Sequence, residues 1–188
     1  MPERRTDGSI EVVAYRPEWV ALFERERAVL STAFGARALS IEHIGSTSVP
    51  GMASKPTIDV LVVVPAIDDV VPSCVGALEE IGYDYRGPFV GEEGSHVVFR
   101  KIVGGKRIVH LHVSSSDSPE PARYRLFRSF LIAVPEAAAR YEACKWSLLD
   151  SCGGDRDVYV GEKQRFVDGL MAEADSWQSA AGRSAEAT

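Results

Sequence analysis

The segment 57-TIDVLVVV-64 constrains the fold of this chain more than any other. It is apolar and Val-rich apart from Asp59, and Pro65 ends it, which is typical of a strand buried in a sheet. A lone carboxylate in such surroundings is costly unless it lies at a strand end or binds a cation. The segment therefore predicts a buried strand and, on that strand, an acid with a function.

Periodicity along the rest of the chain predicts a mixture of helices and strands. After Pro17, apolar residues recur at helical spacing up to Phe34, and Gly82 is a natural stop for a later helix. Two β-rich runs flank 104-GGK-106, which indicates a hairpin. The expected helices cover residues 18–34, 67–81, 119–133, 136–151 and 156–174, and the expected strands cover 38–44, 57–64, 95–103 and 107–113.

This order of elements predicts a domain of the α/β or α+β class, with a mixed β-sheet flanked by helices and a C-terminal helical portion. A chain of 188 residues, of which 45% are hydrophobic, is long enough to bury a proper core and suits a single domain. We expect that domain to span residues 1–175. Residues 176–188 are small and polar, so we expect a flexible tail there.

Charge and cysteine content narrow the function. The formal net charge of -6 gives no electrostatic reason to bind polyanions, so we expect small substrates and no nucleic acid. Cys74, Cys144 and Cys152 are odd in number and far apart, which argues against a disulfide framework and fits a reducing compartment. The N-terminus lacks an apolar export segment and the longest apolar run is far shorter than a membrane span. We therefore expect a cytoplasmic protein without a membrane partner.

The stretch 45-GSTSVPG-51 invites comparison with phosphate-binding loops. A P-loop needs Gly, four residues and then Gly-Lys-Ser/Thr, whereas five residues separate Gly45 from Gly51 here, so the spacing excludes it. The sequence also lacks the Gly-x-Gly-x-x-Gly dinucleotide fingerprint. Two interpretations stay open: a purely structural tight turn, or the start of a helix at which Ser46 and Ser48 add donors for a phosphate.

Asp59 and two histidines are the main candidates for a reactive site. Because side chains alternate along a strand, Asp59 shares a face with Thr57 and Leu61, and His110 shares a face with His112. If the two strands are neighbours in the sheet, one carboxylate and two imidazoles converge. Such a group suits either a metal site or an acid/base cluster.

Several motifs taken together resemble the GrpB family. They are the string 42-EHIGSTSVPGMASKPTIDVLV-62, the later 110-HLHV-113, the run FRSFL that begins at Phe127, and the pairs Tyr141/Lys145 and Tyr159/Lys163. The resemblance extends over about residues 9 to 172. It implies a nucleotidyltransferase-like fold, in which a Gly-Ser turn holds nucleotide phosphates and nearby strand carboxylates bind a divalent metal.

Carried over to this sequence, the resemblance assigns roles residue by residue. Gly45 and Ser46 match the Gly-Ser turn, and Asp59 matches one acid of an Asp-x-Asp pair, whereas Thr57 stands where the other acid is expected. The histidine pair of the HLHV motif falls where a third acid would lie. Imidazole suits Zn²⁺ or Mn²⁺ better than Mg²⁺, which prefers oxygen ligands. The implied cofactor is a divalent metal, Mg²⁺ or Mn²⁺ or else Zn²⁺, bound by Asp59 and the histidine pair.

Basic residues are candidates for holding the phosphates of a nucleotide. Lys55 follows the turn, and Arg128, Lys145 and Lys163 lie beside aromatic residues on expected helices. The alternative for each of them is an ordinary solvated side chain.

Three functions fit these residues. The first is an enzyme that transfers a nucleotidyl group from an NTP to a small-molecule acceptor, with Asp59 and His112 as catalytic residues and Asp59, His110 and His112 as metal ligands. The second is a non-catalytic nucleotide-binding or anion-binding module, suggested by the missing second acid. The third is a different metal-dependent enzyme, a hydrolase or an ATP-using ligase, built on the same residues. The sequence leaves open the acceptor, the base preference, the metal and the oligomeric state.

Overall fold

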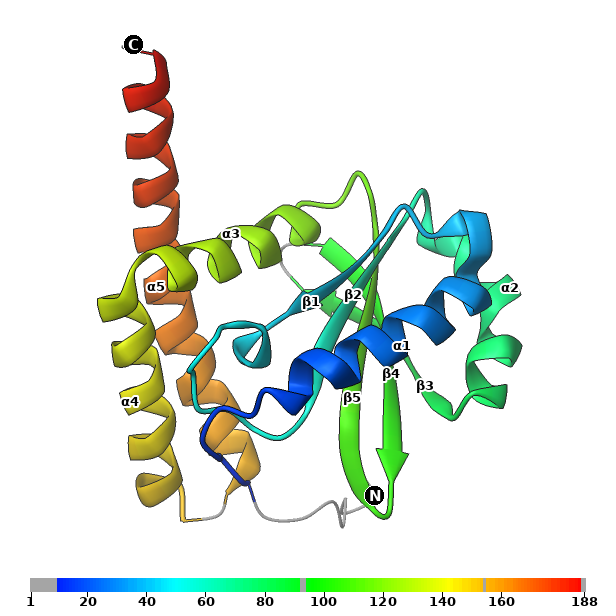
Figure 1. The fold of residues 1–188 in the computed structure, drawn as a ribbon, viewed down its shortest axis with the longest axis horizontal. Helices are drawn as coiled ribbons and strands as arrows, with labels where there is room; N and C mark the ends of the chain where they lie inside the picture. Colours follow the sequence, from blue (N-terminus) through cyan, green and yellow to red (C-terminus); the bar gives the residue numbers. More distant parts are fainter. Residues whose placement is uncertain (1–9, 92–93, 154, 187–188) are drawn as a thin grey trace.

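The computed structural model describes residues 10–91, 94–153 and 155–186. Its central feature is a five-stranded sheet with the order β1-β2-β5-β4-β3 (Figure 1). Strand β2 runs parallel to β5, and the other three neighbouring pairs are antiparallel, so the sheet is mixed, as predicted. The strands are β1 (Ser40–Ile44), β2 (Ile58–Val64), β3 (Tyr83–Gly91), β4 (Gly94–Val103) and β5 (Lys106–Ser115).

Helices flank both faces of this sheet. Helices α1 and α2 cover one face, whereas α3 lies on the other face and leads into α4 and α5 (Figure 1). The predicted α/β fold with a C-terminal helical portion is confirmed. The helices are α1 (Glu18–Phe34), α2 (Ile67–Glu80), α3 (Glu120–Ala133), α4 (Pro135–Ser151) and α5 (Arg156–Glu186).

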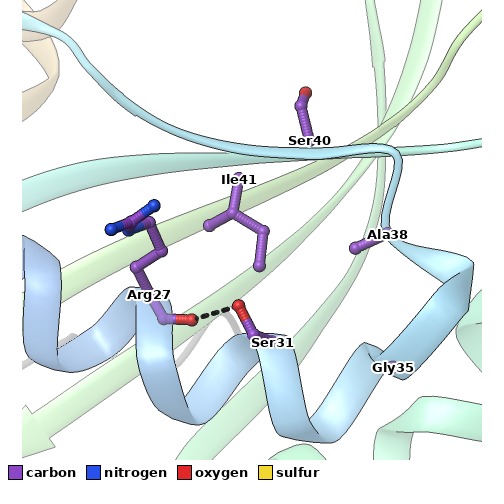
Figure 2. Close-up of a pocket in the computed structure, with 6 residues that line it drawn as sticks. All are labelled: Arg27, Ser31, Gly35, Ala38, Ser40 and Ile41. Carbon is purple, nitrogen blue, oxygen red and sulfur yellow. Dashed lines mark hydrogen bonds between the residues drawn. The ribbon is translucent and has the colours of Figure 1, made fainter.

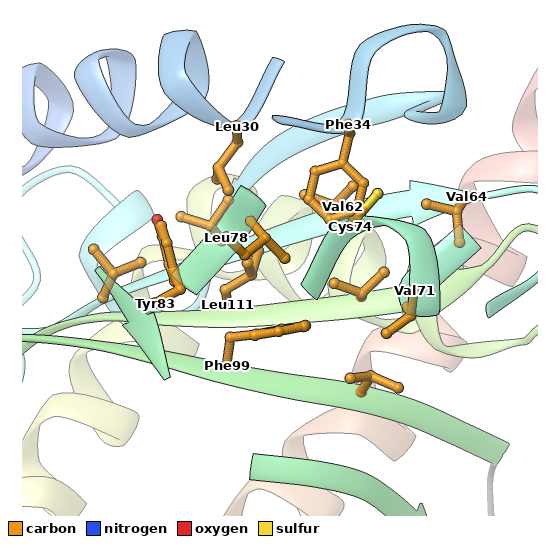
Figure 3. Packing of buried hydrophobic residues seen from close by; sticks show 14 of the residues in the cluster. Leu30, Phe34, Val62, Val64, Val71, Cys74, Leu78, Tyr83, Phe99 and Leu111 are labelled. Atoms are coloured by element: carbon orange, nitrogen blue, oxygen red, sulfur yellow. The ribbon is translucent and has the colours of Figure 1, made fainter. Parts of the chain in front are cut away.

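Alternation of side chains gives the sheet two different faces. Val60 and Val62 of β2 and Leu111 of β5 join the main hydrophobic core, which packs against α1 and α2 (Figure 3). Between them, Leu61 of β2 turns to the opposite face and packs with Tyr124 of α3. Asp59 of β2 and His110 and His112 of β5 occupy this second face, so the reactive side chains are separated from the main core by the sheet itself.

The buried Glu26 links α1 to β3 and β4. The Tyr83 hydroxyl donates to Glu26 Oε2 at 2.8 Å, and Lys101 Nζ lies 3.0 Å from both carboxylate oxygens of Glu26. Burial, with the Glu26 carboxylate adjoining, raises the pKa of Tyr83. This network belongs to the α1 side of the sheet, because Tyr83 is part of the main core.

A groove of about 210 Å³ lies between α1 and the start of β1 (Figure 2). Ser31 of α1 and Ile41 of β1 contribute to its walls, and Arg27 lies at one end. Ile41 packs with the main core, so the groove lies on the α1 side of the sheet. Its lining residues include neither an acid nor a histidine, and the groove is separate from the predicted site.

Strand β3 was not predicted. Its sequence, YDYRGPFVG, contains Gly87 and Pro88, which disfavour an interior strand. The structure accommodates these residues because β3 lies at the edge of the sheet and its register with β4 shifts between Tyr85 and Pro88. Edge strands and bulges tolerate proline, which has no N–H to donate.

Helix α5 extends past residue 174, where its end was predicted, and the tail expected from residue 176 is helical as far as Glu186. Trp177 explains part of this difference, since its ring packs against Phe130 of α3 with centroids 5.9 Å apart. A tertiary contact of this kind stabilises a helix that composition alone does not indicate. Within the described ranges, none of the helices is both long and apolar enough to cross a membrane.

Candidate functional site

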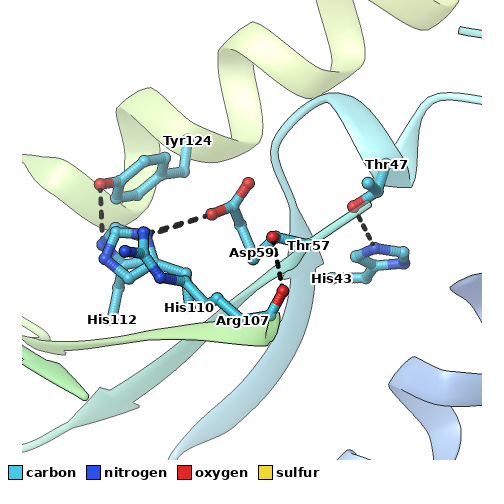
Figure 4. Close-up of polar contacts among 8 residues, drawn as sticks. All are labelled: His43, Thr47, Thr57, Asp59, Arg107, His110, His112 and Tyr124. Carbon is cyan, nitrogen blue, oxygen red and sulfur yellow. Dashed lines mark hydrogen bonds and ion pairs between the residues drawn. The ribbon is translucent and has the colours of Figure 1, made fainter. Parts of the chain in front are cut away.

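Asp59, His110 and His112 converge on the α3 side of the sheet (Figure 4). Parallel pairing of β2 with β5 places Asp59 opposite His110 and Leu61 opposite His112. Asp59 Oδ1 lies 3.3 Å from His110 Nδ1 and 3.8 Å from His112 Nε2. The ring centroids of the two histidines are 4.3 Å apart. The predicted convergence of one carboxylate with two imidazoles is confirmed.

Burial and the neighbouring side chains shift the pKa values of Asp59 and His110 in opposite directions. Burial alone would raise the pKa of Asp59, but the adjacent imidazoles of His110 and His112 outweigh it and hold this pKa below its ordinary value. Burial lowers the pKa of His110 to about 4, although its hydrogen bond to Asp59 opposes the shift. Near neutral pH the site thus contains an ionised carboxylate beside a neutral imidazole. These are the protonation states that a metal ion requires of its ligands.

The three side chains form a donor set that fits a divalent metal ion. One ligand atom from each lies within 4.8 Å of the others. Two imidazole nitrogens and one carboxylate suit Zn²⁺ or Mn²⁺, whereas Mg²⁺ prefers an all-oxygen environment. The side chains of Asp59 and His110 are still 32% and 25% exposed, so a substrate can reach the group.

Gly45 lies directly against the carboxylate of Asp59. Its φ of 69° and ψ of -175° fall in a backbone region that is open essentially only to glycine. A Cβ added at Gly45 would lie 2.4 Å from Asp59 Oδ2. Glycine at this position therefore lets the backbone of the turn approach the acid, as the sequence pattern of a Gly-Ser turn requires.

The turn itself differs from the expected start of a helix. Ser46–Ser48 form a single 3-10 turn, η2, and Val49 is already extended. Pro50 explains this change, because the residue before a proline is disfavoured in the helical region. The buried Ser48 donates its hydroxyl to Gly45 O at 2.6 Å and so closes the turn. Ser46 is partly exposed and remains the turn's candidate for contact with a phosphate.

Two of the basic candidates lie close to Asp59. Burial and the nearby Lys163 lower the pKa of Lys55 to about 8, and Asp59 opposes this shift. Tyr141 raises the pKa of Lys163 most, and Asp59 raises it further. Lys55 Nζ is also 4.3 Å from the centroid of the Tyr159 ring. The charge of Asp59 therefore acts on both Lys55 and Lys163. Two amines near a carboxylate are suited to a polyphosphate bound to a metal.

The other two basic candidates have different surroundings. Lys145 is 2% exposed and donates from Nζ to Ala53 O, while Glu142 Oε2 accepts from Ala53 N at 2.8 Å. Burial lowers the pKa of Lys145 to about 7. Both backbone hydrogen-bonding groups of Ala53 are thus held by α4, which helps to anchor the segment after the turn. Arg128 is exposed on α3, within electrostatic reach of His43.

Tyr124 and Glu120 of α3 were not anticipated as part of the site. The Tyr124 hydroxyl lies 3.3 Å from His112 Nδ1, and Glu120 Oε1 lies 2.7 Å from His96 Nδ1. The His96 ring in turn lies 5.2 Å from that of His112. Burial, with Glu120 and Asp59 adding to it, raises the pKa of Tyr124 and keeps its hydroxyl protonated. The available sequence signal was the spacing of four residues between Glu120 and Tyr124, which places both on one face of a helix.

A protein-family model matches this chain over most of its length. The family described as GrpB protein matches residues 9–173. The chain belongs to the GrpB family.

Curated relatives agree with this assignment. The GrpB chain is 31% identical to glutamate-rich protein GrpB of Alkalihalophilus pseudofirmus over 169 residues, which cover 88% of this chain and 96% of that protein. It is 32% identical to UPF0157 protein YqkA of Bacillus subtilis over 90% of its length, but it spans only 48% of YqkA. It is also 29% identical to a dephospho-CoA kinase of Mycolicibacterium paratuberculosis, of which it spans 48%.

Two solved structures share the fold of this chain. The crystal structure of GrpB from Enterococcus faecalis has a TM-score of 0.80 and 35% identity, and the match covers 89% of this chain and 99% of that one. The poly(U) polymerase Cid1 bound to MgATP has a TM-score of 0.50 over 71% of this chain and 42% of its own. At 11% identity, the likeness to Cid1 shows the fold alone. The predicted GrpB family and nucleotidyltransferase-like fold are both confirmed.

One position separates this GrpB site from an Asp-x-Asp arrangement. Thr57, two residues before Asp59, donates its hydroxyl to Arg107 O at 2.9 Å (Figure 4). The side chain at this position thus bridges to the start of β5 instead of contributing a second carboxylate. A metal ion beside Asp59 would depend on the histidines for its other protein ligands.

His43 gives this GrpB chain a testable pH dependence. The side chain is buried, its Nε2 lies 3.0 Å from Thr47 Oγ1, and its ring stacks on Phe23. Burial lowers the pKa of His43 to about 4. As the pH falls, the unfolded state binds a proton at His43 first, near the ordinary histidine pKa of about 6.5. The free energy of unfolding is therefore unaffected by His43 above that pH and decreases as the pH falls toward 4.

Between neutral pH and the folded-state pKa of His43, we expect the free energy of unfolding to fall by about 2 to 3 kcal/mol because of this residue. Urea unfolding of the wild type and of His43→Gln across this range measures the effect. Glutamine does not titrate, so the variant should show a shallower decline even if it is less stable at neutral pH. Equal slopes for the two proteins would contradict the assignment.

Proposed function

We propose that this GrpB protein is a metal-dependent nucleotidyltransferase that acts on an NTP and a small-molecule acceptor. One observation carries the proposal: the backbone of the Gly45 turn touches the Asp59 carboxylate, which meets His110 and His112. A divalent metal can orient the phosphates of an NTP and stabilise charge during nucleotidyl transfer, and backbone N–H groups of the adjacent turn can bind those phosphates. The nucleotidyltransferase-like fold supports the same function.

Each side chain has a role in this proposal. Asp59 and His110 bind the metal, and His112 acts as a ligand or as the general base. Lys55 and Lys163 offset the charge of the phosphates, and the Gly-Ser turn presents backbone N–H groups to them. A divalent ion held here would neutralise negative charge that develops on the reacting phosphate. The net charge of -6 favours a small acceptor over a nucleic acid.

Specific observations also support two alternative functions. Thr57 in place of an acid favours a nucleotide-binding or anion-binding module without chemistry. A donor set of one carboxylate and two imidazoles is also compatible with another metal-dependent enzyme, such as a hydrolase or an ATP-using ligase.

Turnover of the four common NTPs with Mg²⁺, Mn²⁺ and Zn²⁺ against a panel of small acceptors tests the proposal. Dephospho-CoA belongs in the panel because a relative of this chain is named a dephospho-CoA kinase. We expect release of pyrophosphate that depends on the acceptor and is faster with Mn²⁺ than with Mg²⁺. Nucleotide binding without turnover would favour the binding module, and acceptor-independent release of phosphate would favour a hydrolase. Absence of both metal and nucleotide binding would refute the two metal-dependent enzymes and the nucleotide-binding module.

A further inference from the structure

Both ring nitrogens of His112 meet protein groups. Nε2 lies 3.8 Å from Asp59 Oδ1, and Nδ1 lies 3.3 Å from the Tyr124 hydroxyl (Figure 4). The His112 side chain is only 11% exposed, and the rings of His96 and His110 also lie beside it, with centroids 5.2 and 4.3 Å away. A neutral imidazole carries one proton, and the position of that proton decides which nitrogen donates.

The two partners differ in what they accept and donate. The ionised Asp59 accepts only, so in the absence of a metal it favours the His112 tautomer with the proton on Nε2. Nδ1 is then an acceptor, and the Tyr124 hydroxyl donates to it. A metal ion binds a ring nitrogen through its lone pair, so an ion at Nε2 requires the proton to be on Nδ1, which then donates to the Tyr124 oxygen.

We propose that Tyr124 is a positioning residue that keeps His112 in place in both tautomers, before and after a metal ion binds. This inference rests on the proposed metal site. The exchange is balanced: one proton leaves Nε2 for solvent and one is taken up at Nδ1, so the charge of the ring is unchanged. A hydroxyl suits this position because it both donates and accepts, whereas a carboxylate there would only accept.

The start of α3 holds Tyr124 in position. Glu120, one helical turn before Tyr124, lies 2.7 Å from His96 on β4 and accepts from Ser114 Oγ on β5 at 3.4 Å. The Tyr124 ring packs against a small cluster that includes Leu61 of β2. The hydroxyl is therefore presented by an element that is tied to three strands, and such support is what fixes the geometry of a ligand.

Tyr124→Phe removes the hydroxyl and leaves the ring. On the full chain, calorimetric titration with Zn²⁺ alone should show an affinity about 10-fold to 100-fold lower than that of the wild type, the usual effect of losing a partner that orients a metal ligand. Tyr83→Phe is the matched control, because it also loses a buried hydroxyl contact, to Glu26, but on the other face of the sheet. The control should keep the wild-type affinity.

Nitrogen-detected NMR of the histidine rings gives a second readout that a merely structural role would not move. In the wild type, the His112 proton should be on Nε2 without metal and on Nδ1 with Zn²⁺. In Tyr124→Phe without metal, Asp59 still favours the proton on Nε2, but the Nδ1 resonance should shift because Nδ1 no longer accepts a hydrogen bond. Unchanged Zn²⁺ affinity in Tyr124→Phe, or an equal loss in Tyr83→Phe, would overturn the inference.

A wild type that binds no Zn²⁺ would remove the metal from the proposed function but would still test Tyr124. The metal-free spectra then decide. A His112 Nδ1 resonance that shifts and broadens in Tyr124→Phe supports the positioning role, and identical ring resonances in the two proteins overturn it.

Discussion

Replacing Asp59 with Asn should abolish metal-dependent turnover and weaken metal binding by more than about 100-fold, beyond the loss typical of residues that only orient a ligand. The amide preserves the shape of the side chain but removes the negative charge at the point where two histidines converge. Without that charge, the remaining donors are neutral imidazoles, which hold a divalent ion far less firmly. Calorimetry with Mn²⁺ and Zn²⁺, together with NTP turnover, measures both effects.

Asp69→Asn is the control for this experiment. Asp69 is exposed in the first turn of α2, the helix that packs on the opposite face of the sheet. It changes the net charge of the chain equally but should leave metal binding and turnover at wild-type values. If Asp59→Asn bound metal as tightly as this control, Asp59 would not be a ligand and the proposed chemistry would fail.

Gly45→Ala should have an effect of similar size for a different reason. The new Cβ would lie 2.4 Å from Asp59 Oδ2, so either the turn or the carboxylate has to move. The backbone at Gly45 also lies in a region that costs a residue with a side chain about 1 to 3 kcal/mol. We expect lower stability together with loss of metal binding and turnover, because displacement of the acid separates it from the histidines.

Gly35→Ala isolates the contact with the acid. Gly35 has a φ of 56° and ψ of -138°, close to the same restricted region, but a Cβ there would meet nothing within 4 Å. This control should lose comparable stability and keep its metal affinity. The difference in Zn²⁺ affinity between the two variants measures the approach of the turn to Asp59. If both variants bound Zn²⁺ equally well, the close approach would have no functional role.

Strand alternation made the core of the site predictable from the sequence. It placed His110 and His112 on one face because side-chain direction along a strand is a local property. The pairing that brings Asp59 opposite His110 is not local, since it depends on β5 passing beside β2 in parallel register. The sequence therefore predicted which residues would meet only on the condition that the two strands are neighbours.

Other features had no comparable local signal. Tyr124 reaches His112 from a helix, and the position of that helix over the sheet is set by tertiary packing. Lys145 was predicted to face an anion, but periodicity does not show that a buried amine will find the Ala53 carbonyl. The length of α5 likewise depends on the contact between Trp177 and Phe130. Each of these depends on how separate elements pack together.

Ala53 has a consequence for the order in which the molecule is assembled. Its carbonyl and N–H are held by Lys145 and Glu142, which lie 92 and 89 residues further along the chain. A chain that emerges from the ribosome contains every described strand once Ser115 has been made, and Ser54 can already pair with Val13, yet the segment between Gly45 and β2 lacks its contacts to Glu142 and Lys145 until α4 follows. A partly synthesised chain therefore contains the sheet before the segment next to the site is fully held. Under the proposed function, it can bind a nucleotide in a fixed site only after α4 has been made.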